Sequence, residues 1–254
     1  MRILLSNDDG VFSPGLAALE AELKSLGDVS VVAPAAEQSG VGHSITYLTP
    51  LKCNSIKRNG VHWAWAVEGT PADCVKLAIC ELFKDEPFDL VVSGINNGLN
   101  AGINVLYSGT VAAAIEGAFF GKTSVAVSME YSDDMNVTAA AKIAKNVIGG
   151  IIKNPDSKGQ LFNLNVPTAA TETPTELQVV PMGLAQYGRS YEKRTDPSGR
   201  DYYWALWSDS VEPPPGRTDL NELRKGNVTL TPLKFDMSNQ QLLDDMRSWN
   251  LSTK

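Results

Sequence analysis

A short apolar strand that runs directly into two adjacent aspartates opens the chain, and it constrains the fold more than any other feature. Residues 3–5 are Ile-Leu-Leu without polar alternation, which is typical of a strand buried on both faces. Asp8 and Asp9 follow at once, and Ser13-Pro14 then supplies the N-cap and first position of a helix. The sequence therefore predicts a strand–loop–helix unit with two carboxylates at the carboxyl end of a central strand, where open α/β sheets bind ligands.

The Asn-Asp-Asp-Gly segment at 7–10 has two interpretations. Asparagine and Asp-Gly are common turn residues, so the segment can be purely structural. Two vicinal carboxylates beside a buried strand, however, repel each other unless something positive lies between them, most simply a divalent cation. We take the second interpretation as the working hypothesis and treat Asp8 and Asp9 as candidate metal ligands and catalytic residues.

Composition limits the class of protein. With 254 residues, of which 43% are apolar, the chain can bury one large domain or one domain with an appendage. The formal charge of −7 argues against a nucleic-acid partner, although it leaves room for a small phosphorylated substrate whose charge a metal balances. Neither a signal peptide nor an apolar run of membrane-spanning length is recognisable, so we expect a soluble, cytoplasmic protein without a membrane partner. The three cysteines show no metal-binding spacing, and Cys74 and Cys80 are expected to be reduced core residues.

Short apolar segments alternate with helical patterns over roughly residues 1–170, which argues for a doubly wound, mostly parallel α/β sheet. Residues 45–67 interrupt this rhythm, because strands surround an Asn59-Gly60 turn signal and predict an antiparallel hairpin at an edge or in a lid. Strands are expected at 29–33, 45–48, 51–56, 61–67, 89–93, 123–129 and 162–166, and helices at 14–26 (stopped by Gly27), 71–83, 111–120 and 136–154.

The pattern breaks beyond about residue 168. Many aromatic residues stand there with little local core, which predicts arms that pack on the main domain or on another subunit; a β-rich lobe is the alternative. We expect strands at 177–181, 202–207 and 228–233, a proline spacer at 213–215, a short helix capped by Asp219, and a final helix capped by Ser238 with Leu242, Leu243, Met246 and Trp249 on one side.

Polar loops follow several predicted strands and should meet at one edge of the sheet. The loop after the second strand holds Ser39-Gly40, and the glycine- and asparagine-rich stretch 94–110 is long for a structureless loop unless it is functional. Its end, Ser108-Gly109-Thr110, suits a phosphate at a helix N-terminus, with ordinary capping by Thr110 as the alternative. His43 is either an acid or substrate contact or a structural residue, and His62 is expected to be structural.

All ligand candidates in these loops are oxygen donors, which favour Mg²⁺, Mn²⁺ or Ca²⁺ over zinc. The chain has no HExxH, CxxC, P-loop or Gly-x-Ser-x-Gly motif, so the chemistry that those motifs mark is not indicated.

Five separated blocks of sequence resemble the SurE family. They are SNDDG with FSPG at the N-terminus, EQSGVGHSIT at 37–46, GTPADCV at 69–75, the SGIN-x-G-x-N-x-G run at 93–102, and YSGTVAAAIEG at 107–117. Weaker matches continue through NLNVP at 163–167, GRTD at 216–219 and VTLTPL at 228–233, so the resemblance covers nearly the whole chain.

The resemblance implies a metal-dependent phosphatase, a 5′-nucleotidase that acts on nucleoside 5′- and 3′-monophosphates. It implies a Rossmann-like catalytic core at 1–183, which includes the 45–67 hairpin, and a C-terminal oligomerisation extension at 184–254 exchanged between the subunits of a homodimer or homotetramer. One divalent cation per subunit would be held by Asp8, Asp9, Ser39 and Asn96, with Asp8, Asp9 and Asn96 catalytic. Ser108, Gly109 and Thr110 would line the phosphate pocket, and Asn7, Gly40, His43 and Asn100 in the same loops are further candidate substrate contacts.

Residues 101–106 depart from the family pattern. Many members carry an acidic Leu-Gly-Asp-Asp-type run where this chain has Ala-Gly-Ile-Asn-Val-Leu. This difference bears on substrate preference and not on the metal. Two alternatives to a nucleotidase also stay open: a phosphatase for short polyphosphate or sugar phosphates, and a non-catalytic metal- or nucleotide-binding module.

Overall fold

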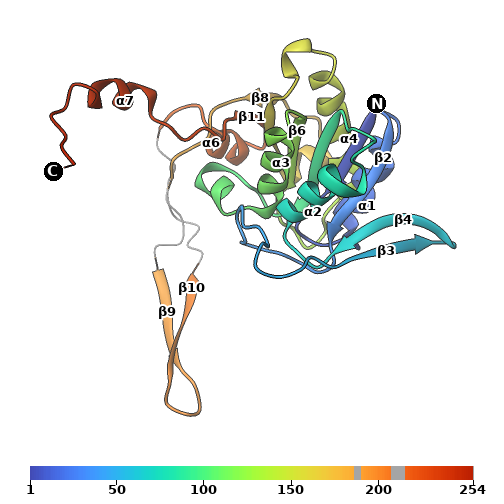
Figure 1. Cartoon of the computed structure of the whole chain (residues 1–254), viewed down its shortest axis with the longest axis horizontal. Helices are drawn as coiled ribbons and strands as arrows, with labels where there is room; N and C mark the ends of the chain where they lie inside the picture. The colour runs from blue at the N-terminus through green and yellow to red at the C-terminus, as the bar shows by residue number, and fades with distance from the viewer. Residues whose placement is uncertain (186–189, 207–214, 254) are drawn as a thin grey trace.

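A nine-stranded sheet forms the centre of the computed structural model, which describes residues 1–185, 190–206 and 215–253 (Figure 1). The strand order is β3-β4-β2-β1-β5-β6-β7-β11-β8. The strands are β1 (Arg2–Ser6), β2 (Asp28–Pro34), β3 (Cys53–Arg58), β4 (Val61–Val67), β5 (Leu90–Asn97), β6 (Thr123–Met129), β7 (Leu161–Val166), β8 (Leu177–Val179) and β11 (Val228–Leu233). The helices are α1 (Pro14–Leu23), α2 (Pro71–Leu77, continued by a π-helical turn at Ala78–Leu82), α3 (Gly109–Phe119), α4 (Val137–Ile151), α5 (Thr168–Glu172), α6 (Asp219–Arg224) and α7 (Gln240–Met246), with 3₁₀ turns at Gly102–Leu106 and Pro155–Ser157.

The six strands from β4 to β7 in this order are parallel, so the predicted α/β, doubly wound, mostly parallel fold is confirmed. β3 runs antiparallel to β4 at one edge, and β11 runs antiparallel to β7 on the other side. The chain builds outward from β1 in both directions, through β2 on one side and β5 on the other. The gap between the loops that follow β1 and β5 is therefore the topological switch point, where such folds bind ligands.

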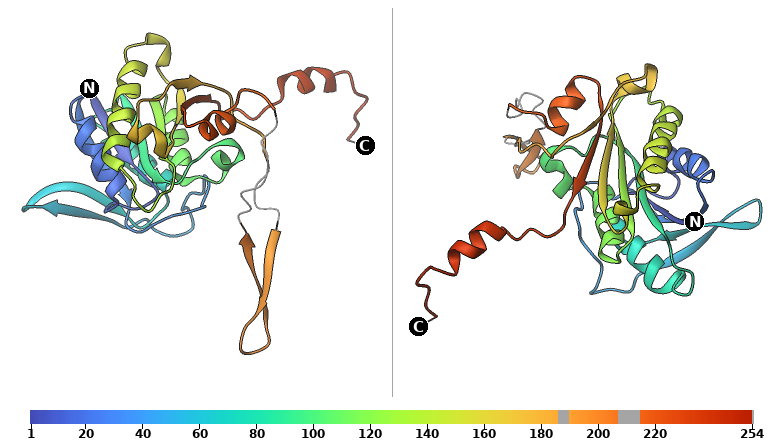
Figure 2. Two further views of the ribbon diagram at one scale, coloured as in Figure 1. Left: turned by 180° about the vertical axis from the view of Figure 1, so that it is seen from behind. Right: turned by 90° about the horizontal axis from the view of Figure 1, so that it is seen from above.

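The strand β1 is buried on both faces, as its apolar sequence predicts. Ile3 and Leu5 belong to the core formed with α1 and α4, whereas Leu4 packs with α2 and α3 on the opposite face. All three side chains are fully buried, and burial of each contributes about 1.5–3 kcal/mol. Two helical layers thus hold β1 and fix the position of the residues that follow it (Figure 2).

The first helix begins where the sequence predicts and ends earlier. Ser13 caps it by accepting a hydrogen bond from the Leu16 N–H (3.2 Å), but the helix ends at Leu23 rather than just before Gly27. Gly27 has a different role, because a Cβ at this position would lie 2.2 Å from the Met1 carbonyl oxygen. The glycine lets the chain turn closely past the start of β1.

Two local predictions in the next segment are wrong. Residues 45–48 form no strand, because Thr46 bonds through its N–H and hydroxyl to the Asp73 carboxylate (2.9 and 2.7 Å) and not to a neighbouring strand. Cys80 is exposed and so is no core residue, whereas Cys74 is buried, and burial raises the pKa of its thiol well above the usual range. The Asn59-Gly60 turn of the β3–β4 hairpin is confirmed, with both residues at positive φ.

The C-terminal helix caps also differ from prediction. Thr218 caps α6 and Asn239 caps α7, in place of Asp219 and Ser238. Asp219 is instead fully buried, and its carboxylate accepts hydrogen bonds from the N–H groups of Gly102 (2.8 Å) and Gly183 (2.7 Å). A residue far along the sequence thus fixes the loop that follows β5.

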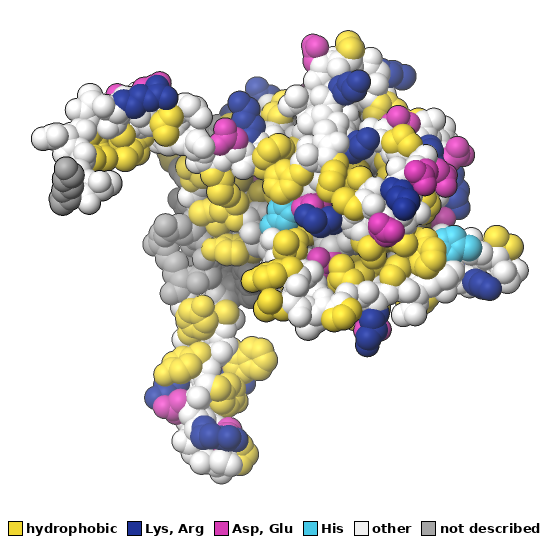
Figure 3. Space-filling model, viewed as in Figure 1, with side chains coloured by type: hydrophobic (Ala, Val, Ile, Leu, Met, Phe, Trp, Pro, Cys, Tyr) yellow, Lys and Arg dark blue, Asp and Glu magenta, His cyan; other side chains and the backbone are white. Residues whose placement is uncertain are grey.

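A hairpin of β9 (Ser190–Thr195) and β10 (Asp201–Leu206) and the helix α7 extend away from the body of the molecule (Figure 1). The expected aromatic strand is β10, although residue 207 and most of the proline run at 213–215 lie outside the described residues. Large apolar side chains are exposed on both projections, among charged and polar ones (Figure 3). They include Tyr191, Tyr202, Tyr203, Trp204 and Leu206 on the hairpin, and Leu242, Leu243, Met246 and Trp249 in the last segment.

Candidate functional site

Two carboxylates stand at the switch point, directly after β1. Asp8 is 6% exposed, and its Oδ1 accepts a short hydrogen bond from the Thr110 hydroxyl, at the start of α3. The Asp9 Oδ2 accepts from the Asn97 N–H at the end of β5 (3.3 Å). The pair is therefore held from two elements that are distant in sequence, as the sheet topology requires.

The turn that presents the pair is closed by Asn7. Its side-chain Nδ2 donates to the Gly10 carbonyl (2.9 Å), and Gly10 has a φ of +96°, which favours glycine. The Asn7 Oδ1 is buried and has no hydrogen-bond partner in the structure. Asn7 thus shapes the turn and leaves an acceptor unsatisfied beside the acidic pair.

The surroundings of the pair oppose two negative charges. Burial raises the pKa of Asp8 above its ordinary value. Burial, the neighbouring Asp8 charge and, to a smaller extent, Glu37 together raise the pKa of Asp9 to about 6, against the opposing effect of the hydrogen bond from the Asn97 N–H. A bound cation would reverse this effect, since it favours the ionised form of both carboxyls.

The end of β5 is irregular where it approaches the pair. Its register with β6 shifts between Ser93 and Asn96, and a Cβ on Gly94 would lie 2.3 Å from the Val127 carbonyl oxygen. Such a bulge redirects the strand end. Beyond it, the Asn96 Nδ2 donates to the Gly98 carbonyl (2.7 Å), which leaves the carboxamide oxygen available as a ligand.

The start of α3 lies against Asp8. Ser108 is the N-cap and accepts from the Val111 N–H (3.1 Å), so the alternative of ordinary capping by Thr110 does not hold: the Thr110 hydroxyl bonds to Asp8 instead. Gly109 permits the close approach, because a Cβ there would lie 3.0 Å from both the Asp8 Cβ and the Pro71 Cγ. The positive end of the α3 dipole therefore faces the acidic pair.

The Ser39 loop reaches the pair through its backbone. The Gln38 N–H donates to the Asp8 carbonyl (2.8 Å), while the Ser39 hydroxyl donates to Glu37 (2.6 Å). Gly40 lies in open space with a φ of +69°. Ser39 and Asn96 each directly adjoin a residue that bonds to the acidic pair, Gln38 and Asn97 respectively.

Two candidate substrate contacts are engaged elsewhere. Asn100 is buried, and its Nδ2 donates to the Ser128 hydroxyl (2.9 Å). His43 pairs with the buried Glu116 of α3 (2.8 Å) and stacks on Phe119. Burial alone would raise the pKa of Glu116, but hydrogen bonds from His43 and Lys76 outweigh burial and lower it. His62, expected to be structural, bonds to Ser55 (2.8 Å).

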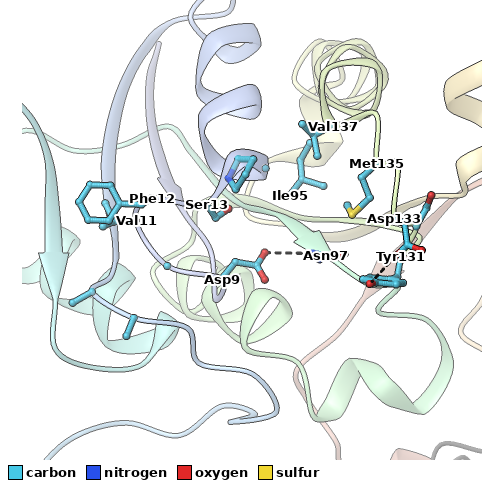
Figure 4. Close-up of a pocket in the computed structure, with 16 residues that line it drawn as sticks. Asp9, Val11, Phe12, Ser13, Ile95, Asn97, Tyr131, Asp133, Met135 and Val137 are labelled. Atoms are coloured by element: carbon cyan, nitrogen blue, oxygen red, sulfur yellow. Dashed lines mark hydrogen bonds between the residues drawn. The ribbon is translucent and has the colours of Figure 1, made fainter.

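A cleft of about 660 Å³ opens beside Asp9 (Figure 4). It runs between the start of α1, the end of β5 and the loop after β6, and Asn97, Tyr131 and Met135 line it with Asp9. No sequence motif marks the loop after β6 as functional. Its position after a buried strand, at the same sheet edge as Asp9, was the available signal.

Within the described residues, no group of three or more His, Cys, Asp or Glu side chains is arranged to hold a metal, so a cation here would need neutral oxygen ligands beside the two carboxylates. None of the described helices is long and apolar enough to cross a bilayer. The fold and this edge define a doubly wound α/β protein with an acidic candidate ligand site at its switch point.

Comparisons with known proteins identify the family. The model of the family "Survival protein SurE" matches residues 3–189. A 5′-nucleotidase SurE from Rhodopirellula baltica is 71% identical over 251 residues, with 99% of each chain covered. One from Syntrophus aciditrophicus is 42% identical and covers 98% of this chain and 93% of its own. The crystal structure of the SurE protein from Aquifex aeolicus superposes with a TM-score of 0.82 at 35% identity, covering 97% of this chain and 98% of that one. The chain belongs to the SurE family.

Proposed function

We propose that this protein is a metal-dependent 5′-nucleotidase that hydrolyses nucleoside 5′-monophosphates, and also 3′-monophosphates, to nucleoside and phosphate. Relatives named 5′-nucleotidase SurE at up to 71% identity over the whole chain support this activity. The observation that carries the proposal is the placement of Asp8 against the N-terminus of α3, with Asp9 next to it in the chain and bonded to the end of β5. A cation held by carboxylates and a neighbouring helix N-terminus would both attract the negative charge of a phosphate group, from two sides.

The residues at the switch point fit a hard divalent cation. Asp8, Asp9, the Asn96 carboxamide and the Ser39 hydroxyl provide oxygen ligands only. A bound cation would offset the burial that raises the pKa of both aspartates. We assign these oxygen ligands one Mg²⁺, Mn²⁺ or Ca²⁺ per subunit. When bound, the cation would polarise a phosphoryl oxygen and lower the pKa of a ligated water.

The remaining residues orient these groups and the phosphate. The N–H groups of Gly109 and Thr110 and the Ser108 hydroxyl at the start of α3 would stabilise negative charge on the phosphoryl oxygens. Thr110 fixes Asp8, and the Asn97 N–H fixes Asp9. We further propose that Asn7 shapes the turn after β1, and Gly40 the Ser39 loop, next to the phosphate.

Asn100 and His43 act through other residues. Asn100 secures the loop after β5 against β6 through Ser128. His43 anchors the Ser39 loop to α3 through Glu116. We therefore assign both residues to the support of the substrate-binding loops.

We also propose that residues 1–183 form the catalytic unit and that residues 184–254 hold subunits together in a cytoplasmic homodimer or homotetramer. The apolar surfaces of the projecting hairpin and of α7 support this role, because single chains rarely leave so many large apolar side chains exposed. Light scattering of the intact protein, compared with a variant carrying charged residues at Tyr203 and Trp204, tests the assignment. A monomeric wild-type protein contradicts it.

The activity is tested by phosphate release from 5′-AMP, 3′-AMP, a sugar phosphate and short polyphosphate, first with EDTA and then with Mg²⁺ or Mn²⁺ restored. Release that stops with the chelator and returns with the metal is the expected result. Asp9→Asn, which keeps the shape and removes the charge, should lower kcat/KM by more than about 100-fold, the upper range for a residue that only orients a ligand. The exposed Asp156→Asn serves as the matched control and should keep wild-type rates. Metal binding without phosphate release would favour the binding-module alternative, and release only from sugar phosphates or polyphosphate would favour the other.

A further inference from the structure

The cleft beside Asp9 lies on the opposite face of the sheet from the proposed phosphate site. It is bordered by the N-terminus of α1 and by Val137 at the start of α4, which both cover one face of the sheet. The helix α3, whose N-terminus meets Asp8, covers the other face together with α2. A phosphate at the start of α3 would therefore have Asp8 and Asp9 beside it and the cleft beyond them.

The cleft is large enough for a nucleoside and has mixed chemistry. Its volume of about 660 Å³ lies within the usual range for small-molecule sites. Ile95 and Met135 give it apolar walls, while Asn97, Ser132 and Asp133 provide polar groups (Figure 4). A nucleoside needs both kinds of surface, because its base is flat and largely apolar on its faces and its ribose carries hydroxyl groups.

Tyr131 is the side chain in this cleft best placed to receive a base. The residue is 65% exposed, and its hydroxyl donates to the Asp133 carboxylate (3.2 Å), which restrains the side chain at its tip and leaves most of it accessible. The other aromatic side chain of the cleft, Phe12, lies at the far end and is already next to Trp63, with ring centroids 6.5 Å apart. Bases stack on such aromatic surfaces whatever their sequence identity.

We propose that this cleft is the nucleoside subsite, and that the base of the substrate stacks on Tyr131 while its phosphate lies at Asp8, Asp9 and the start of α3. The subsite rests on the proposed nucleotidase activity. It assigns a specificity-determining role to the loop after β6. Because stacking needs no base-specific hydrogen bond, the subsite favours nucleotides over phosphates without a base and discriminates weakly among bases.

A second cavity, of about 640 Å³, is the competing location. It touches the phosphate site at Ser108 and is lined by His43, Phe119 and Phe235. The ring side chains of this cavity already have protein partners, since His43 binds Glu116 and Phe119 packs against Phe235. The cleft at Tyr131 instead includes Asp9 itself, so it is continuous with the acidic pair.

The test compares 5′-AMP with ribose 5-phosphate, which is the same phosphate ester without the base. The measured quantity is the ratio of kcat/KM for the two substrates, in the intact protein with Mg²⁺ present. Tyr131→Ala should lower this ratio about tenfold, the effect of losing one stacked base. Tyr131→Phe, which keeps the ring, should restore most of the ratio. Tyr47→Ala, which removes a 78% exposed aromatic ring outside the cleft, should leave it unchanged.

Two results would overturn the subsite. An unchanged ratio in Tyr131→Ala would do so, as would a ratio that falls in Phe119→Ala and not in Tyr131→Ala, which would place the nucleoside in the second cavity. If the wild-type protein releases phosphate from neither compound, the nucleotidase proposal fails, and calorimetric binding of the same two compounds then decides the subsite. Loss of affinity for AMP relative to ribose 5-phosphate in Tyr131→Ala would support it, and equal affinities would overturn it.

Discussion

Thr110→Val isolates the hydrogen bond that holds Asp8. Valine has nearly the shape of threonine, so the fully buried site stays filled while the hydroxyl that donates to the Asp8 Oδ1 is lost. Asp8 would remain buried with one donor fewer and with greater freedom at the start of α3. We expect weaker metal binding and a lower kcat/KM, because both depend on the position of this carboxylate.

The size of the effect follows from the kind of bond removed. A hydrogen bond to a charged group contributes about 1.5–3 kcal/mol, and 1.4 kcal/mol corresponds to a factor of ten. Thr110→Val should therefore reduce kcat/KM, or the affinity for Mg²⁺, by about 10- to 150-fold. Thr110→Ser keeps the hydroxyl and should recover most of the loss.

The assay is phosphate release from 5′-AMP over a series of Mg²⁺ concentrations, together with the free energy of unfolding of each variant. Thr123→Val is the matched control, because this buried hydroxyl donates to the Ser157 carbonyl (2.9 Å) away from the site. It should lose comparable stability and keep its activity. If Thr110→Val retained full activity and metal affinity, the hydroxyl would not position a functional carboxylate, and this account of the site would be refuted.

Two further predictions concern backbone space and charge. Gly15→Ala should destabilise the fold, because the new Cβ would lie 2.3 Å from the Ile95 carbonyl oxygen. Gly150→Ala, in an open position on α4, should stabilise the fold by up to about 1 kcal/mol. Equal free energies of unfolding for the two variants would contradict this prediction. The pKa of Asp9 in the folded protein, about 6, lies above the value of an unfolded aspartate, so its ionisation opposes folding as pH rises from about 4 to 6. The quantity to measure is the free energy of unfolding of the wild type minus that of Asp9→Asn. In EDTA this difference should fall by at most about 3 kcal/mol between pH 4 and 7, and excess Mg²⁺ should remove the fall. A rise over the same pH interval would refute the raised pKa of Asp9.

Local signals predicted the centre of the fold because they are strong there. The unbroken apolar run of β1 and the Ser13-Pro14 helix start need no distant partner to be recognised, and the structure confirms both. The Asn59-Gly60 hairpin turn is of the same kind. Where the outcome depends on a long-range partner, local signals were not enough. The strand predicted around Thr46 is absent because Thr46 bonds to Asp73. At the start of α3 the sequence left capping by Thr110 open as an alternative, and the structure excludes it because Thr110 bonds to Asp8 and Ser108 caps the helix.

In the candidate site too, local signals predicted some features, whereas features that depend on long-range contacts could not be predicted. Sequence order places Asp8, Asp9 and the start of α3 at strand ends, and the structure brings these three together. The role of Asp219 in fixing Gly102, 117 residues away, could not be seen in a local pattern, since it depends on how α6 returns to the sheet. The cleft at Tyr131 likewise forms only because the folded sheet brings the loops after β1, β5 and β6 next to one another.

The antiparallel return of β11 has a consequence for how the chain folds during synthesis. β11 pairs with β7 although about 60 residues separate the end of one from the start of the other. At 5–20 residues per second, a ribosome needs roughly 3–12 s to produce that interval. For this time β7 presents an unpaired edge, which is a template for association with other chains. The nascent protein is thus most prone to aggregation after its central strands have formed and before its last strand emerges, so a slow stretch of translation within residues 167–227 should lower the soluble yield without changing the finished structure.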